Sequence, residues 1–259
     1  MTINRWTDPD DIRFYDTPIG MLVSSTSVLK VLHKPALPAW SARLSAEFLG
    51  KRLLDLKEGR VLLSEDNYRE EIDALVKEAK GQHALTLAQR GERGTNIHHA
   101  IYEYFTERKR PEEDGSDTPL LFKSFLSWWA DYRPDGGICE ETVWSKKGYA
   151  GTLDMVAEFG GEVDGFWIND FKSGKAIYDE AIMQVASYLY AWEERGGTRA
   201  QGAIVTRLHT TGYEVKVYTR AECREAFKRF KYLLAYVLAN NRRKEKLKKS
   251  LDNGAENGI

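Results

Sequence analysis

A change of hydrophobic period near residue 138 most constrains how this chain can fold. Upstream, apolar residues recur at helical spacing, whereas from 138 to 171 the chain contains three strand-like runs separated by turns. The last two runs are GTLDMVAEF and VDGFWINDFK, with a turn at Gly160-Gly161. This pattern predicts an antiparallel meander of three strands. A helix at about 178–195 and two further strands, QGAIVTRL and YEVKVYT, then predict an α/β fold with a mixed sheet.

Helices are expected around that sheet, and no Pro/Gly/Ser-rich linker divides the chain. Two short strands are predicted within 12–23, around the turn Thr-Pro-Ile-Gly. We expect helices from Pro38 into the fifties and at 64–80, 84–108 and 119–132. One domain over 1–245 would then have a mainly helical part (1–135), a β-rich core (136–218) and a C-terminal helix (219–245). The tail, 246–259, is expected to be disordered.

Composition excludes several classes of protein. The 259 residues are 42% hydrophobic, which is enough for a sizeable core, and the net charge of −1 gives no global signal for nucleic acid. Two cysteines, Cys139 and Cys223, cannot form a four-cysteine metal site and are expected to be reduced thiols. The N-terminus lacks the apolar region of a secretory signal, and no stretch reaches about 18 apolar residues. These features predict a cytoplasmic protein with no membrane partner.

The meander places charged residues where they could meet. Alternate side chains in a strand share a face, so Asp170 and Lys172 point the same way. Asp154 lies in an apolar strand, and a buried lone charge needs a partner or a metal. The turn at Gly160-Gly161 would bring Asp154 beside Asp170, and two carboxylates near a lysine suit a hard divalent cation. The alternative is a solvated Asp170–Lys172 pair with Asp154 capping a turn.

Residues on the flanking helices add to this arrangement. In RGTNIHHAIYEYF (93–105), His98 falls at the edge of the apolar stripe, whereas His99 falls nearly opposite. His98 is therefore the histidine placed to reach an interior site. Gln184 and Tyr188 lie four residues apart and share one face of the helix that directly follows the Asp170 strand. Each of these residues, taken alone, would also suit an ordinary core or surface role.

Together these positions resemble the PD-(D/E)XK nuclease superfamily. The resemblance is to its RecB-like exonuclease branch, which includes phage-encoded exonucleases and the mitochondrial genome maintenance exonuclease. It covers roughly residues 14–195 and rests on four motifs in the order and at the approximate spacings of that branch: G-T-x-x-H at Gly94–His98, G-T-L-D at Gly151–Asp154, D-F-K at Asp170–Lys172 and Q-x-x-x-Y at Gln184–Tyr188.

The resemblance implies a role for each motif residue and a restriction-endonuclease-like core with an N-terminal helical region. His98, Asp154, Asp170 and the carbonyl of Phe171 would ligate one or two Mg²⁺ or Mn²⁺ ions. Lys172 would orient or deprotonate the attacking water and stabilise charge on the phosphate. Gln184 and Tyr188 would contact DNA or buttress the site. Glu140 or Glu141 would supply a further acidic position, and the sequence does not decide between them, because neighbours in a strand face opposite ways.

The resemblance further implies a Mg²⁺- or Mn²⁺-dependent deoxyribonuclease. We expect an exonuclease that acts on single- or double-stranded DNA ends in recombination, repair or end processing, with a recombinase or single-strand-binding protein as a further partner. A phage-encoded enzyme would act in the host cytoplasm. The iron–sulfur cluster of some RecB-like nucleases needs four cysteines and is not expected here. The alternatives are a structure-selective endonuclease and a noncatalytic nucleic-acid-binding protein on the same fold.

DNA contacts would come from basic and aromatic side chains. The candidates for stacking on bases are Trp128, Trp129, Trp144 and, above all, Tyr149. The candidates for phosphate contacts are Lys51, Arg52, Arg90, Arg93, Lys146, Lys147, Lys175 and the run from Arg242 to Lys249.

Overall fold

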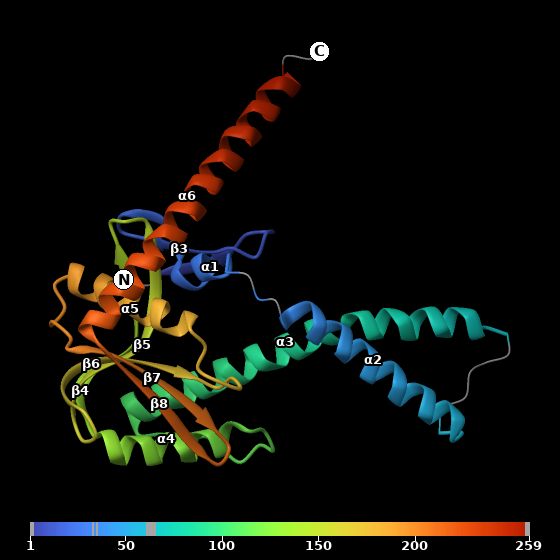
Figure 1. Cartoon of the computed structure of the whole chain (residues 1–259), viewed down its shortest axis with the longest axis horizontal. Helices are drawn as coiled ribbons and strands as arrows, with labels where there is room; N and C mark the ends of the chain where they lie inside the picture. The colour runs from blue at the N-terminus through green and yellow to red at the C-terminus, as the bar shows by residue number, and fades with distance from the viewer. Residues whose placement is uncertain (1–2, 33, 35, 61–65, 257–259) are drawn as a thin grey trace. The chain divides into compact units, whose positions relative to one another are not determined.

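The computed structural model describes residues 3–32, 34, 36–60 and 66–256, with side chains as far as Asn241. The chain forms two compact units (Figure 1). One unit is built from Met1–Leu32 and Asn96–Ile259, and the other from His33–Thr95. Helix α3 (Tyr68–Glu107) itself continues across the boundary at Thr95.

The smaller unit contains α2 (Ala36–Lys57) and the first part of α3. We expected two helices, at 64–80 and 84–108, but α3 runs unbroken through Gly81. A helical glycine costs only about 1 kcal/mol relative to alanine, and the helix formers around it outweigh that cost. The Ser45 hydroxyl donates a 2.7 Å hydrogen bond to the Ala79 carbonyl and so links α2 to α3.

The larger unit is built on a mixed sheet of eight strands, which confirms the predicted α/β fold. The sheet runs β1-β2-β3-β5-β6-β7-β8, and β4 pairs with β5. Two neighbouring pairs are parallel, β3 with β5 and β6 with β7, and the other pairs are antiparallel. The bounds of the strands are β1 (Asn4–Thr7), β2 (Arg13–Thr17), β3 (Gly20–Ser24), β4 (Pro134–Ser145), β5 (Tyr149–Gly160), β6 (Asp164–Lys172), β7 (Gly202–His209) and β8 (Gly212–Thr219).

Helices cover both faces of this sheet. One apolar cluster joins the sheet to α1 (Ser25–Leu29), α5 (Glu180–Glu194) and α6 (Arg220–Glu256). A second cluster joins the opposite face to α4 (Thr118–Tyr132) and to the part of α3 that holds Ile97 and Ile101. Figure 1 shows α4 along one side of β7 and β8, with α5 on the other side. None of the helices in the described part of the chain is long and apolar enough to cross a membrane.

The structure differs from the sequence expectations at both ends of the chain. The strand β1 was not predicted, because NRWT is short, exposed and without alternation. Helix α6 was expected to end at 245 but continues to Glu256, so residues 246–256 are helical and not a disordered tail. Its lysines, leucines and glutamates are good helix formers and no proline interrupts them. Residues 257–259 lie outside the described residues.

The sheet splits at the middle of β5. Tyr149 and Ala150 pair with β3, whereas pairing with β6 begins at Met155. Between them, 151–154 have no strand partner on this edge within the described chain, although β4 pairs with the opposite edge. A split of this kind leaves main-chain groups and the side chain of Asp154 available for other partners. The residues that resemble nuclease motifs gather at this point.

Candidate metal centre

His98, Glu140 and Asp154 form a compact group beside the split. Their candidate ligand atoms all lie within 4.8 Å of one another. His98 Nδ1 is 3.3 Å from Glu140 Oε1 and 3.4 Å from Asp154 Oδ1. His98 Nε2 lies 3.1 Å from the carbonyl oxygen of Phe171. Two carboxylates, from β4 and β5, thus converge on Nδ1 of the α3 imidazole. The Phe171 carbonyl of β6 contacts the other ring nitrogen and orients the ring.

His98 is in place because of the apolar stripe of α3. Ile97, Ala100 and Ile101 are buried against the face that α4 covers, which leaves His98 at the edge of the stripe, half-buried. His99 is exposed and lies 3.7 Å from Glu103 on its own helix. The prediction that His98 and not His99 faces the interior is confirmed.

Asp154 is fixed by a hydrogen bond that crosses the split. The Phe171 amide donates to Asp154 Oδ2 at 2.6 Å, and the aspartate is buried. Burial would raise the pKa of Asp154, but the positive charges of His98 and Lys172 and the Phe171 amide outweigh it and hold the pKa below its usual value. Burial would likewise lower the pKa of His98, yet Asp154 and Glu140 hold it well above its usual value. The group therefore attracts positive charge.

The structure decides between the two neighbouring glutamates in favour of Glu140. The register sets Cys139 opposite Met155 and Glu141 opposite Leu153, so Glu140 falls opposite Asp154. Glu140 has φ +56°, in the left-handed region, and its carboxylate reaches His98. Such a conformation costs about 1–3 kcal/mol outside glycine, so the contacts of Glu140 must compensate for it. Glu141 instead contacts Arg195, with Oε1 3.3 Å from Nη1.

Asp170 and Lys172 form a second group next to the first. The strand register that pairs Met155 with Asn169 brings Asp170 level with Asp154, as the hairpin predicted. However, the nearest partner of Asp170 is Lys172, with Nζ 2.7 Å from Oδ2. Asp170 is fully buried, and this burial raises its pKa to about 6. Burial would lower the pKa of Lys172, but the charges of Asp170 and Asp154 raise it above its usual value.

Gln184 ties this second group to α5. Its side-chain amide donates to Asp170 Oδ1 at 3.3 Å and to the Tyr188 hydroxyl at 2.9 Å, and its oxygen accepts from Lys172 Nζ at 3.2 Å. One glutamine thus orients the aspartate and the lysine together. Gln184 and Tyr188 lie on one face of α5, as predicted, and their hydroxyl–amide contact connects the helix to the Asp170–Lys172 pair.

The glycine of the G-T-L-D motif has a steric role. A Cβ at Gly151 would lie 2.3 Å from Cε1 of Tyr188 and 3.3 Å from the Ser25 hydroxyl oxygen. Tyr188 can therefore pack onto β5 only because position 151 lacks a side chain. The first residue of the G-T-L-D motif, Gly151, and the last residue of the Q-x-x-x-Y motif, Tyr188, therefore pack against each other.

Two of the aromatic candidates for DNA stacking were wrong. Tyr149 is fully buried and donates a 2.9 Å hydrogen bond to the Ser187 carbonyl, and Trp128 is fully buried against Phe171 and Phe159. Trp144 is only half-buried. A single sequence does not separate these cases, because each tryptophan or tyrosine suits a core equally well. The side chains from Arg242 to Lys249 lie outside the described residues.

The residues fit a hard divalent cation. Carboxylate oxygens suit Mg²⁺ and Mn²⁺, and the imidazole of His98 adds one nitrogen ligand to this oxygen set. Asp170 Oδ2 is buried and accepts no well-formed hydrogen bond from the described residues, although Nζ of Lys172 is near. Of the four residues predicted as ligands, His98 and Asp154 converge with Glu140, whereas the Phe171 carbonyl contacts His98 Nε2 and Asp170 faces Lys172.

A scan of the chain against models of known protein families gives no match, and a search of curated proteins gives no significant match either. The chemistry of the site is therefore argued from its geometry.

Proposed function

We propose that this protein is a metal-dependent deoxyribonuclease that hydrolyses phosphodiester bonds, and that it acts as an exonuclease on DNA ends. One observation carries the proposal. A group of candidate metal ligands (His98, Glu140 and Asp154) lies beside a half-buried lysine, Lys172, that Asp170 and Gln184 hold in place. A bound cation and a positioned positive charge can together stabilise the charge that develops in phosphodiester hydrolysis.

Different residues of this chain would bind the metal ion and act on the phosphate. His98, Glu140 and Asp154 would hold the ion, and the Phe171 carbonyl would orient the His98 ring. The ion, when bound, would lower the pKa of a water molecule and polarise a phosphoryl oxygen. Lys172, whose Nζ lies 2.7 Å from Asp170 Oδ2, would orient or deprotonate the attacking water and stabilise negative charge developing on the phosphate.

Asp170 and Gln184 would act as positioning residues for Lys172. Both contact the ammonium, and Tyr188 in turn contacts Gln184. The order of the four motifs supports membership of the RecB-like branch of the PD-(D/E)XK superfamily. Use in recombination or end processing, alongside a recombinase or single-strand-binding protein, belongs to the same proposal.

The test is cleavage of three end-labelled or closed DNA substrates: linear duplex, linear single strand and covalently closed circle. Each is incubated with Mg²⁺, Mn²⁺ or EDTA. Asp154→Asn and Lys172→Met are compared with matched surface controls, Glu158→Ala on the same strand and Lys123→Ala on α4, both exposed.

We expect metal-dependent loss of linear DNA with the circle intact, no activity from either site variant, and wild-type activity from the two controls. Cutting of the circle would identify an endonuclease instead. No cleavage by folded wild type of any substrate with either metal would overturn the proposal and favour a noncatalytic DNA-binding protein.

A further inference from the structure

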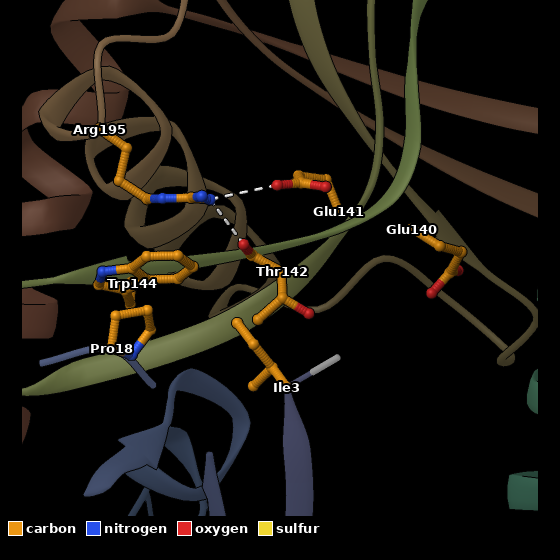
Figure 2. Close-up of a pocket in the computed structure, with 7 residues that line it drawn as sticks. All are labelled: Ile3, Pro18, Glu140, Glu141, Thr142, Trp144 and Arg195. Carbon is orange, nitrogen blue, oxygen red and sulfur yellow. Dashed lines mark hydrogen bonds and ion pairs between the residues drawn. The ribbon is translucent and has the colours of Figure 1, made fainter. Parts of the chain in front are cut away.

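A cavity of about 370 Å³ opens beside the candidate metal centre, and Glu140 is the one residue of its lining that the mechanism above uses. Its volume falls within the range of roughly 300–1,000 Å³ that is typical of small-molecule sites. The N-terminal segment supplies Ile3 and Pro18, β4 supplies 140–142 and Trp144, and Arg195 follows the end of α5. Figure 2 shows these side chains around the opening, with Glu140 on the opposite side from Trp144.

One wall of the cavity is a stacked pair of planar groups. The Cζ atom of Arg195 lies 3.5 Å from the centroid of the Trp144 ring, so the guanidinium rests on the indole. Arg195 Nη1 also donates to the Thr142 carbonyl at 2.7 Å and to Glu141 at 3.3 Å (Figure 2). These contacts hold the guanidinium in one orientation. Together with Ile3 and Pro18 they give the cavity a mixed surface, part apolar and part hydrogen-bonding.

The charges of the wall favour an uncharged occupant over an anion. Glu140 and Glu141 face one guanidinium, so the wall carries more negative than positive charge. Arg195 Nε and Nη2 have no hydrogen-bond partner among the described residues and are available as donors. The Glu141 carboxylate is available as an acceptor. A flat heterocycle with amino groups and ring carbonyls or nitrogens would satisfy both, and stacking on arginine or aromatic planes is how proteins bind exposed bases.

Glu140 connects this cavity to the candidate metal centre, because it belongs to both. We propose that the cavity binds one nucleobase of the DNA strand held at the metal centre, next to the bond that is cut. This inference rests on the proposed nuclease function and adds a base-binding subsite to it. Ile3, Trp144 and Arg195 would then decide how strongly one nucleotide position contributes to binding.

The test uses short oligonucleotides, single-stranded and duplex, in which each position in turn is abasic. Binding to the full chain is measured by fluorescence anisotropy with Mg²⁺, in a Lys172→Ala background that prevents cleavage. Ile3→Trp fills the cavity without removing any of the polar contacts above. Ile19→Trp is the matched control, because Ile19 is exposed on the turn beside Pro18 and does not line the cavity. Arg195→Lys keeps the charge but removes the planar stack.

We expect one abasic position to weaken binding about 5- to 100-fold, the range of one lost base stack. That penalty should vanish in Ile3→Trp and shrink in Arg195→Lys, and it should persist in Ile19→Trp. If oligonucleotides bind with no position-specific penalty, or if the penalty survives in Ile3→Trp, the base-binding cavity is wrong while the nuclease proposal stands. If no oligonucleotide binds, both proposals fail together.

Discussion

The main-chain amide of Phe171 donates a 2.6 Å hydrogen bond to the side chain of Asp154 across the split in the sheet. The carbonyl of the same residue lies 3.1 Å from His98 Nε2. Phe171 thus orients Asp154 with its N–H group and His98 with its C=O group. Its own ring is buried against Phe125 and Trp128, which holds this peptide unit in place. The core of the protein therefore sets the geometry of the site.

Two substitutions of Asp154 should separate its structural role from its chemical one. Asp154→Asn keeps an oxygen for the Phe171 amide but loses the charge, so we expect a folded protein whose DNA hydrolysis falls to the level seen in EDTA. Asp154→Ala also leaves the buried amide unpaired, which costs about 1–3 kcal/mol of the free energy of unfolding. Denaturant unfolding and DNA cleavage measured on both variants check this. Equal stability of the two variants would contradict the role of the hydrogen bond.

Gly151→Ala should destabilise the protein, because the added Cβ would lie 2.3 Å from the Tyr188 ring. Overpacking of this kind costs about 1–3 kcal/mol, measured as the free energy of unfolding in denaturant. Gly160→Ala, at the end of the same strand, is the control: a Cβ there meets nothing within 4 Å. A wild-type unfolding curve for Gly151→Ala would show that Tyr188 does not rest on β5 as described.

Gln184→Ala should lower the rate of DNA hydrolysis without unfolding the protein. The substitution removes the contacts of Gln184 with Asp170, Lys172 and Tyr188. Loss of such an orienting residue lowers activity by about 10- to 100-fold. We expect the fall in kcat, with KM for DNA and the thermal midpoint near their wild-type values. A change confined to KM would instead assign Gln184 to DNA binding.

Glu194, which is not a member of the metal centre, should make a pH-dependent contribution to stability. Its carboxylate accepts from the Ser145 hydroxyl at 2.5 Å and from the Lys146 amide at 2.9 Å. Burial would raise the pKa of Glu194, but these hydrogen bonds, with Lys147 and Lys146, hold it below its usual value. The folded protein thus binds the proton less well than the unfolded chain, so this stabilisation is full above the unfolded pKa and is lost as the pH falls through the folded pKa.

Glu194→Gln should therefore lower the free energy of unfolding at pH 7, by no more than about 1 kcal/mol because solvent screens this exposed group, and the difference should narrow as the pH falls below the unfolded pKa of about 4.3. Calorimetry across this range measures it, and Glu158→Gln at an exposed position is the control. A difference that stays constant with pH would contradict a charged Glu194 as the source of the effect.

The sequence predicted the meander and its consequences well because they depend on local rules. Alternation along β5 and β6 placed Asp170 and Lys172 on one face, and the turn between the strands set Asp154 level with Asp170. The helical stripe likewise separated His98 from His99. Each of these relationships follows from the direction of side chains, which repeats every 2 residues in a strand and about every 3.6 residues in a helix.

Other parts of the site depend on features that the spacing of apolar residues in the sequence does not predict. Glu140 joins the metal centre through a left-handed φ, which the letters Glu140-Glu141 do not reveal. The pairing of Asp170 with Lys172 rather than with the His98 group depends on side-chain contacts with Gln184. The cavity brings Ile3 beside β4, more than a hundred residues away along the chain, and no local pattern encodes a contact of that range.

Binding of Mn²⁺ to two neighbouring variants tests the central claim most directly. The account places Glu140 at the metal centre and Glu141 against Arg195. Calorimetric titration of the wild type, Glu140→Gln and Glu141→Gln with Mn²⁺ compares the same chemical change at adjacent positions. We predict that Glu140→Gln weakens binding by about tenfold or more and that Glu141→Gln binds as the wild type does. Equal affinities for all three proteins, or a loss confined to Glu141→Gln, would contradict the proposed metal centre.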